Sequence, residues 1–245
     1  MEKNSIISLK DVKKSFDDFC VLKGVNLEIE KGNSVVLLGK SGTGKSVILQ
    51  IIAGLLYPDS GKVIVLDKNV PELDEAELRE LRKKIGFLFQ SGALYDSMTV
   101  RENLEFPLRR HFKELKEKEI NELVKEALDD VGLLPAIDKM PSELSGGMKK
   151  RAGLARTIIL QPEIMLYDEP TTGLDPETSR EISNLIIKMQ EKFKVSSLII
   201  THDMECAKMT ADKISVLKDG EIIVEGDYAG LSKSNIPFVK SFFIF

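Results

Sequence analysis

Eight consecutive residues, Gly39 to Ser46, match the pattern G-x-x-x-x-G-K-[ST] of a phosphate-binding loop. The glycines allow backbone conformations that side chains forbid, so that successive N–H groups can converge on phosphate oxygens. Lys45 adds a positive charge for the β- and γ-phosphates, and the Ser46 hydroxyl is a hard oxygen ligand for Mg²⁺. We expect contacts to a nucleoside triphosphate from Gly39, Lys40, Ser41, Gly42, Thr43, Gly44, Lys45, Ser46 and Val47.

Other polar side chains follow apolar runs farther along the chain. Asp168 and Glu169 come directly after one such run, His202 follows another, and Gln90 ends a third. Of the two adjacent carboxylates, one suits Mg²⁺ and the other suits a base for water. A histidine after a strand is often only a structural residue, but its place among these other strand ends favours a functional role.

These side chains can meet only if the apolar runs are strands of one sheet. Buried strands are predicted at 34–38, 62–66, 85–89, 164–167 and 197–201, helices at 47–53, 72–84 and 176–193, and a hairpin over 214–224. The strand that ends at Asp168 is expected to neighbour the strand that feeds the phosphate loop. The alternation of strands and helices predicts a mainly parallel sheet, with the site at the carboxyl ends of its strands.

Two regions depart from this alternation. Residues 5–30 carry short strands with half-buried alternation, and residues 91–156 show helical spacing without strand signals. The sequence therefore predicts one α/β domain over residues 1–245. Its phosphate-loop core spans 1–90 and 157–245 and begins with an antiparallel β-subdomain, and a helical subdomain is inserted at 91–156.

The composition excludes several classes of protein. The chain has 245 residues, of which 42% are hydrophobic and 30% charged, as in an ordinary globular protein. A net charge of −4 gives no support to nucleic acid as a partner. Cys20 and Cys206 form no ligand cluster, which indicates free thiols in a reducing compartment. The start of the chain has no signal-peptide core, and no window approaches about eighteen apolar residues. We therefore expect a cytoplasmic location, with any membrane role exerted through a partner.

Six segments, in order along the chain, resemble the motifs of the ATP-binding cassette (ABC) ATPases over essentially the full length. They are Gly39–Ser46, Gln90, Leu144–Met148, Ile164–Pro170, Gly173–Asp175 and His202. One such motif arises easily by chance, whereas all six in the family's order are specific. The resemblance implies hydrolysis of ATP, with ATP and Mg²⁺ as cofactors.

The resemblance also implies individual roles. Lys45, Gln90, Glu169 and His202 are expected to be catalytic, with Glu169 as general base and His202 as the γ-phosphate switch. Ser46, Gln90 and Asp168 are expected to hold Mg²⁺. Phe16 is expected to stack on adenine, although the residues alone leave Phe16 and Phe19 equally open to stacking or to core packing.

A second copy of the chain is implied as a partner. In the family, the segment matched by Ser145, Gly146 and Gly147 closes over ATP bound to the other subunit, and Asp175 lies in a further nucleotide-binding motif. Because one chain carries one phosphate loop and one such segment, two complete sites require a head-to-tail dimer.

A narrower likeness joins segments 87–95, 100–109 and 140–148 to the Mla/Mce-associated lipid-trafficking ATPases. In that branch the ATPase drives a membrane permease that moves phospholipid between membranes. The chain is then expected at the inner face of the cell membrane, held there by permease subunits. Importers of methionine or polar amino acids share most of the motifs and stay alternatives. A repair or translation ATPase would need a long coiled coil or a second cassette, and a GTPase or small-molecule kinase would not need the Leu144–Met148 segment.

Two apolar groups keep two interpretations each. Leu94, Tyr95 and Met98 could form a groove for a permease helix or be buried within the helical region. The last eight residues contain Phe238, Phe242, Phe243 and Phe245, which should be buried because exposed aromatic side chains gain nothing from ordering. The chain's own core and a second subunit are both candidate partners, and we favour the chain's own core.

Overall fold

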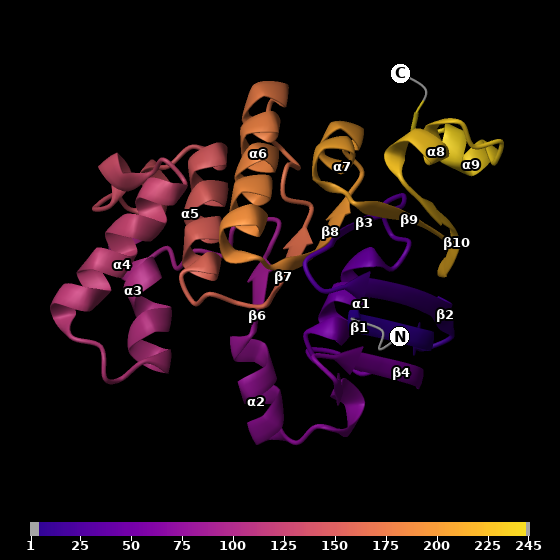
Figure 1. Ribbon diagram of the computed structural model, residues 1–245, viewed down its shortest axis with the longest axis horizontal. Helices are drawn as coiled ribbons and strands as arrows, with labels where there is room; N and C mark the ends of the chain where they lie inside the picture. The colour runs from indigo at the N-terminus through magenta and orange to yellow at the C-terminus, as the bar shows by residue number, and fades with distance from the viewer. Residues whose placement is uncertain (1–4, 244–245) are drawn as a thin grey trace.

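The structure is a computed structural model and describes residues 5–243. Its larger sheet, at the centre of Figure 1, has the strand order β10-β9-β3-β8-β7-β6. The strands are β3 (Ser34–Leu38), β6 (Ile85–Leu88), β7 (Ile164–Asp168), β8 (Ser196–Thr201), β9 (Lys213–Lys218) and β10 (Glu221–Gly226). Neighbouring strands pair in parallel except β9 and β10, which form an antiparallel hairpin. The predicted mainly parallel sheet is confirmed.

One prediction about this sheet is wrong. The strand that ends at Asp168, β7, does not neighbour the phosphate-loop strand β3, because β8 lies between them. In the sequence, β7 and β8 read as similar apolar runs, so the local pattern could not decide which of these two strands pairs with β3. The carboxyl ends of β3, β8 and β7 still meet at one edge, since the three strands run in the same direction.

The smaller sheet is antiparallel and has the order β2-β1-β4-β5. Its strands are β1 (Ser5–Phe16), β2 (Phe19–Glu30), β4 (Ser60–Val65) and β5 (Lys68–Asn69). The sequence predicted several short strands over 5–30, whereas β1 and β2 are 12 residues long each. Register shifts interrupt the alternation between Leu9 and Val12, where Asp11 has a φ of 49°. Such a bulge breaks the period of two without ending the strand.

Seven of the described α-helices lie in connections between strands, and the last two follow the last strand. They are α1 (Lys45–Ile52), α2 (Glu75–Lys83), α3 (Val100–His111), α4 (Glu117–Asp130), α5 (Gly146–Ile158), α6 (Pro176–Phe193), α7 (Met204–Thr210), α8 (Tyr228–Ser232) and α9 (Pro237–Lys240). Short 3-10 turns cover Val70–Glu72, Leu134–Ala136 and Pro141–Glu143. The helix predicted over 72–84 begins later, because Asp74 caps α2. Helices α3, α4 and α5 fill the stretch between β6 and β7. Because α5 continues past residue 156, the predicted end of the helical subdomain, the division into subdomains stays a prediction.

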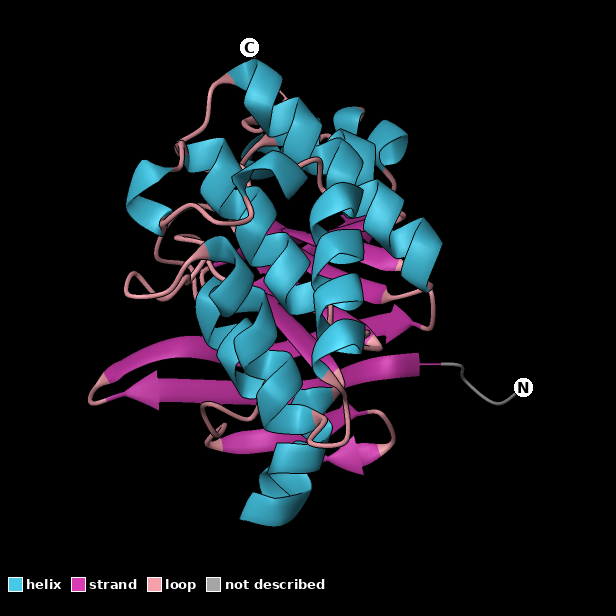
Figure 2. Ribbon diagram, turned by 90° about the vertical axis from the view of Figure 1, so that its left-hand side faces the viewer, coloured by secondary structure: helices cyan, strands magenta, loops and turns pink. Residues whose placement is uncertain are grey.

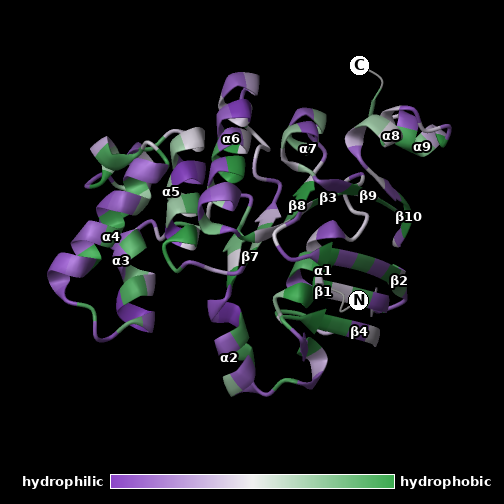
Figure 3. Ribbon diagram, viewed as in Figure 1, coloured by the Kyte–Doolittle hydropathy of each residue, from purple (hydrophilic) through white to green (hydrophobic). Residues whose placement is uncertain are grey.

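Two hydrophobic clusters flank the parallel sheet. Val35 and Leu37 of β3 face α1 and the antiparallel sheet, whereas Val36 and Leu38 face the helices α3 to α7. Figure 1 shows α1 between the two sheets, and Figure 2 shows most helices stacked above the long antiparallel strands. In Figure 3 the central strands are largely hydrophobic, whereas α2 and α4 carry many hydrophilic residues. The phosphate-loop strand is therefore buried on both faces, as parallel strands usually are.

Over residues 5–243, no helix has both the length and the hydropathy needed to cross a lipid bilayer.

Candidate functional site

The loop between β3 and α1 has the backbone that its glycines predict. Gly42 and Gly44 have φ angles of 79° and 98°, in the left-handed region that other residues rarely adopt. A Cβ atom on Gly44 would also lie 2.8 Å from the Leu22 side chain, so space as well as conformation requires glycine there. Gly44 caps α1, whose first N–H groups and dipole then face the ligand side of the loop.

Side chains of the loop support its shape. The Lys45 ammonium donates to the carbonyl oxygens of Gly39 at 2.8 Å and Lys40 at 3.0 Å. The Thr43 hydroxyl donates to the Lys40 carbonyl oxygen at 2.9 Å. Lys45 is only 7% exposed, and burial lowers its pKa, although the nearby carboxylates of Glu169 and Asp168 oppose that shift. A buried ammonium at the centre of a glycine-rich loop suits a ligand that brings negative charge.

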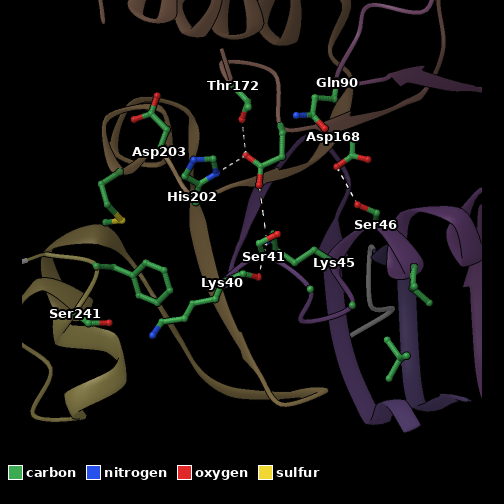
Figure 4. A pocket seen from close by; sticks show the side chains of 17 residues that line it. Lys40, Ser41, Lys45, Ser46, Gln90, Asp168, Thr172, His202, Asp203 and Ser241 are labelled. Atoms are coloured by element: carbon green, nitrogen blue, oxygen red, sulfur yellow. Dashed lines mark hydrogen bonds and ion pairs between the residues drawn. The ribbon is translucent and has the colours of Figure 1, made fainter. Parts of the chain in front are cut away.

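A pocket of about 990 Å³ opens in front of this loop (Figure 4). It gathers side chains from the ends of β3, β6, β7 and β8, as the predicted parallel sheet requires. Its lining consists of Val21, Lys40, Ser41, Gly42, Gly44, Lys45, Ser46, Val47, Gln90, Asp168, Glu169, Thr172, His202, Asp203, Met204, Ser241 and Phe242. Most of the residues expected to bind nucleotide, metal or water thus share one cavity.

The residues expected to hold Mg²⁺ fit that ion. The Ser46 hydroxyl donates to Oδ1 of Asp168 at 3.2 Å, and Gln90 lines the same cavity. Burial raises the pKa of the Asp168 carboxyl, because the Ser46 hydroxyl and the Lys45 and Lys150 ammonium groups only partly offset the cost of burying its negative charge. Hydroxyl, carboxylate and amide oxygens are the hard donors that Mg²⁺ prefers, and a divalent cation would supply the missing charge.

Glu169 is held by contacts on three sides. Oε2 of its carboxylate lies 2.8 Å from Nδ1 of His202 and accepts a hydrogen bond from the Thr172 hydroxyl at 3.0 Å. Oε1 lies 3.8 Å from the Lys45 ammonium. The backbone of Glu169 has a φ of 50°, a left-handed conformation that costs roughly 1–2 kcal/mol for a residue with a Cβ. Its N–H donates to the carbonyl oxygen of Ile200 at 2.9 Å, which ties the strained residue to β8.

Two groups of expected nucleotide-binding residues lie outside the described lining of this pocket: Ser145, Gly146 and Gly147, expected to meet a second subunit's ATP, and Asp175. The Ser145 hydroxyl caps α5 by accepting from the Met148 N–H at 3.3 Å, and Gly146 and Gly147 form the first turn of α5. Asp175 caps α6 by accepting from the Thr178 N–H at 3.0 Å. These two helix starts lie together, because a Cβ on Gly147 would come within 2.5 Å of Thr178.

Phe16 also lies outside the described lining. The side chain is 44% exposed near the tip of the β1–β2 hairpin, with the Lys14 ammonium 5.5 Å from its ring centre. Phe19 is 68% exposed, so neither aromatic residue packs in the core. Val21, on the same hairpin, is the residue that reaches the pocket. The proposed stacking of Phe16 on adenine stays a prediction.

Several residues around the site were not predicted. Thr172 follows Glu169 by one turn, Lys150 of α5 donates to the Glu169 carbonyl oxygen, and Ser241 and Phe242 reach the pocket from the end of the chain. Sequence spacing could have suggested only Thr172, since a hydroxyl three positions after a carboxylate in a turn is within reach. The other contacts depend on the tertiary fold.

Comparisons with known proteins agree with this geometry. Residues 22–172 match the family model described as ABC transporter. The chain is 42% identical over 236 residues to the probable ribonucleotide transport ATP-binding protein mkl of Mycobacterium leprae. This alignment covers 96% of this chain and 68% of the mkl protein. It is 37% identical over 240 residues to the intermembrane phospholipid transport system ATP-binding protein MlaF of Haemophilus influenzae. That alignment covers 96% of this chain and 90% of MlaF.

A solved structure extends the comparison to three dimensions. A dimeric ATP-binding cassette, captured in a post-hydrolysis state with ADP and Pi, is 35% identical, has a TM-score of 0.83, and covers 90% of this chain and 98% of that one. The phosphate-loop α/β fold predicted from the sequence is thereby confirmed. Fold and site together define an ATP-hydrolysing nucleotide-binding cassette. The chain belongs to the ABC transporter family, with the predicted likeness to the Mla-associated ATPases confirmed by the match to MlaF.

Proposed function

We propose that this chain binds Mg-ATP in the pocket in front of Gly39–Ser46 and hydrolyses it with Glu169 as general base. The observation that carries the proposal is the Glu169 carboxylate, fixed by His202 and Thr172 on one oxygen and facing Lys45 with the other. A carboxylate so placed can orient a water molecule and accept its proton. Lys45 would hold the β- and γ-phosphates, and His202 would contact the γ-phosphate.

Ser46, Asp168 and Gln90 would hold the metal, and Phe16 would stack on adenine. When bound, Mg²⁺ neutralises charge that develops on the phosphates. The chain's own part is to present these oxygens on rigid strand ends, so that little reorganisation is needed when ATP arrives.

The working unit is proposed to be a head-to-tail dimer of this chain. Ser145 and Gly146 are exposed at the start of α5, outside the described lining of the pocket, where a second copy's nucleotide could meet them, and the buried Gly147 follows in the same turn. The start of a helix, where the first N–H groups have no carbonyl partner within the helix, suits phosphate oxygens. The similar cassette solved with ADP and Pi is itself dimeric. Loss of the γ-phosphate would remove contacts shared by the two subunits and let the dimer open.

The transported substrate is proposed to be phospholipid. MlaF, which bears the name of an intermembrane phospholipid transport system, matches almost end to end, whereas the mkl protein extends well beyond the aligned part. The chain would then act at the inner face of the membrane, through permease subunits. Ribonucleotide, named for the mkl protein, and an amino acid are the competing substrates.

The chemistry is tested with two variants that should behave in opposite ways. Glu169→Gln keeps the shape but cannot accept the proton of water, so ATP should persist and hold a dimer together. Lys45→Ala removes the charge that holds the phosphates, so neither binding nor dimer formation should occur. Size-exclusion chromatography with Mg-ATP distinguishes them, with the wild-type protein and ADP as controls. Hydrolysis by Glu169→Gln at the wild-type rate would show that Glu169 is not the base.

The substrate is tested by affinity isolation of the complex from native membranes. Co-purified permease subunits that carry bound phospholipid, identified by mass spectrometry, would support the proposal. A complex that carries a ribonucleotide or an amino acid, and no lipid above the level of a mock isolation, would overturn it.

A further inference from the structure

A buried lysine lies behind the hydrolytic carboxylates. Lys150 of α5 is 5% exposed, and its ammonium donates to the main-chain carbonyl oxygen of Glu169 at 3.2 Å. Burial lowers its pKa, although the nearby carboxylates of Asp168 and Glu169 favour the charged form. A buried charge is costly for the fold, so a cation placed against these carboxylates calls for an explanation beyond stability.

The contact acts on the backbone of Glu169. That residue has the left-handed φ of 50°, and three hydrogen bonds hold its main chain. Its N–H donates to the carbonyl oxygen of Ile200 in β8, and its own carbonyl oxygen accepts from the Lys150 ammonium of α5 and from the Thr172 N–H at 3.3 Å. Because the carboxylate is attached to this strained backbone, a small rotation of the peptide would displace it from its place beside His202. Lys150 therefore provides one of the three main-chain hydrogen bonds of Glu169, and this bond comes from α5.

The helix that carries Lys150 is linked to other parts of the nucleotide machinery. Ser145 caps α5, and at 1.5 Å per residue Lys150 lies about 7.5 Å farther along the same rigid helix. The loop after Gln90 packs directly on α5, since a Cβ on Gly92 would approach the Lys149 carbonyl oxygen to 2.9 Å. A shift of α5 at its first turn must therefore be transmitted to the Lys150 ammonium.

We propose that Lys150 is a positioning residue, which couples the position of α5 to the orientation of the Glu169 carboxylate. The inference rests on the proposed function, in which Glu169 is the base and the start of α5 meets the partner's ATP. In each half of the dimer, closure of α5 on the partner's nucleotide would then set the base at the same subunit's own nucleotide. Hydrolysis would be coupled in this way to complete closure of the dimer.

The experiment compares Lys150→Met with Lys150→Arg and Lys149→Met. Methionine keeps the length but removes the donor, so kcat for ATP should fall at least 10-fold, while the Kd for ATP changes less than 2-fold. Arginine keeps a charged donor and should retain at least a third of wild-type kcat. Lys149→Met, a matched loss of charge at the neighbouring half-buried position, should leave kcat within 2-fold.

A second measurement separates positioning from general damage. In the Glu169→Gln background, Lys150→Met should reduce the residual single-turnover rate less than 2-fold, because residues that act as a unit are not additive. An unchanged kcat for Lys150→Met, an equal loss in Lys149→Met, or an additive loss in the double variant would overturn the inference. If Lys150→Met does not fold, Lys150→Gln is used, and the same outcomes apply.

The outcome also distinguishes this inference from the proposed function. A wild-type rate in Glu169→Gln would refute the base itself, and with it the role of Lys150. A slow Glu169→Gln variant together with a normal Lys150→Met variant would refute only the role of Lys150.

Discussion

Nδ1 of His202 lies 2.8 Å from Oε2 of Glu169, and the two partners differ sharply in exposure. The histidine side chain is 62% exposed, whereas the glutamate side chain is 15% exposed. The carboxylate is thus held within the protein, while much of the imidazole faces the open pocket (Figure 4). A ring in this position can bridge a fixed base and a ligand that enters from solvent.

His202→Ala should therefore lower kcat much more than ATP affinity. Loss of a hydrogen bond to a charged group costs about 1.5–3 kcal/mol, which corresponds to roughly 10- to 100-fold in rate. Thr172→Val removes the other hydrogen bond to Oε2 at nearly constant shape and should cost about 3- to 10-fold. Steady-state kcat and the Kd for ATP, measured separately, check both. A Thr172→Val enzyme slower than His202→Ala would contradict this ranking.

Acidification should weaken Mg²⁺-dependent binding of ATP through Asp168. Burial raises the pKa of its carboxyl above the ordinary 3.8. In the ligand-free protein, the stability linked to this group is present below pH 3.8 and is lost as the pH rises through the folded-state pKa. Because Mg²⁺ requires the ionised Asp168 carboxylate, Mg²⁺-dependent binding of ATP should strengthen as the pH rises through that pKa.

The Kd for ATP at fixed free Mg²⁺, measured from about pH 5 to pH 8, checks this direction. Asp168→Asn is the control, since it lacks the ionisation and yet keeps an oxygen for the Ser46 hydroxyl. The titration of ATP itself is common to both proteins, so a difference between the two pH profiles reports Asp168. Parallel profiles would contradict the prediction.

Tyr95 should carry the contact with a permease. Of the three residues predicted for that groove, Leu94 packs against the hydrophobic cluster and Met98 is half-buried, whereas Tyr95 is 42% exposed. Its ring packs edge-on against the Phe106 ring, with 5.1 Å between the two ring centres. The Arg156 guanidinium carbon lies 4.7 Å from the centre of the Tyr95 ring. A rigidly held, exposed aromatic side chain is a typical anchor at protein interfaces.

Tyr95→Glu should abolish stimulation of ATP hydrolysis by the permease and leave the basal rate within about 2-fold, as expected for a surface change away from the chemistry. Tyr57→Glu is a matched control, because Tyr57 is 45% exposed at the end of the loop after α1. ATPase assays of the reconstituted complex and of the isolated subunit provide both rates. Equal stimulation in all three proteins would rule out Tyr95 as the contact.

Deletion of residues 236–245 should lower the melting temperature of the ligand-free monomer. Val239 is fully buried, and Phe238, Phe242 and Phe243 pack against the hydrophobic cluster, as the favoured interpretation of the sequence predicted. Phe245 lies outside the described residues. A fully buried side chain of this size contributes about 1.5–3 kcal/mol, and each kcal/mol shifts the melting temperature by roughly 2–4 °C. We expect a loss of at least about 5 °C.

Thermal denaturation with and without ATP distinguishes this result from its alternative. An unchanged monomer with weaker ATP-dependent dimerisation would assign the tail to the second subunit. No change in either property would contradict both interpretations.

The sequence predicted those parts of the site that depend on local chemistry. Gly44 has the left-handed backbone that the phosphate-loop pattern predicts, and Asp168 and Glu169 follow an apolar run that reads as a buried strand. The order of β3, β8 and β7 could not be predicted in the same way, because all three runs are equally apolar. Pairing among them is decided by the whole fold.

Lys150 shows the limit most clearly. It stands in the charged run Lys149–Arg151, which reads as a solvated helix face, yet α5 turns this one lysine inward. Its partner is a backbone carbonyl oxygen 19 residues away, and a main-chain acceptor leaves no mark in the sequence. Phe242, near the end of the chain, lines the same pocket as the phosphate loop near its beginning, and no local pattern can indicate a contact over so long a sequence separation.

Each central strand contributes to both hydrophobic clusters. Val36 of β3, Tyr167 of β7 and Ile199 of β8 belong to one, while their neighbours Val35, Leu166 and Leu198 belong to the other. Neither cluster can lose its packing while the other keeps these strands extended. The helical and antiparallel halves should therefore melt as one cooperative unit, with calorimetric and van't Hoff enthalpies that agree.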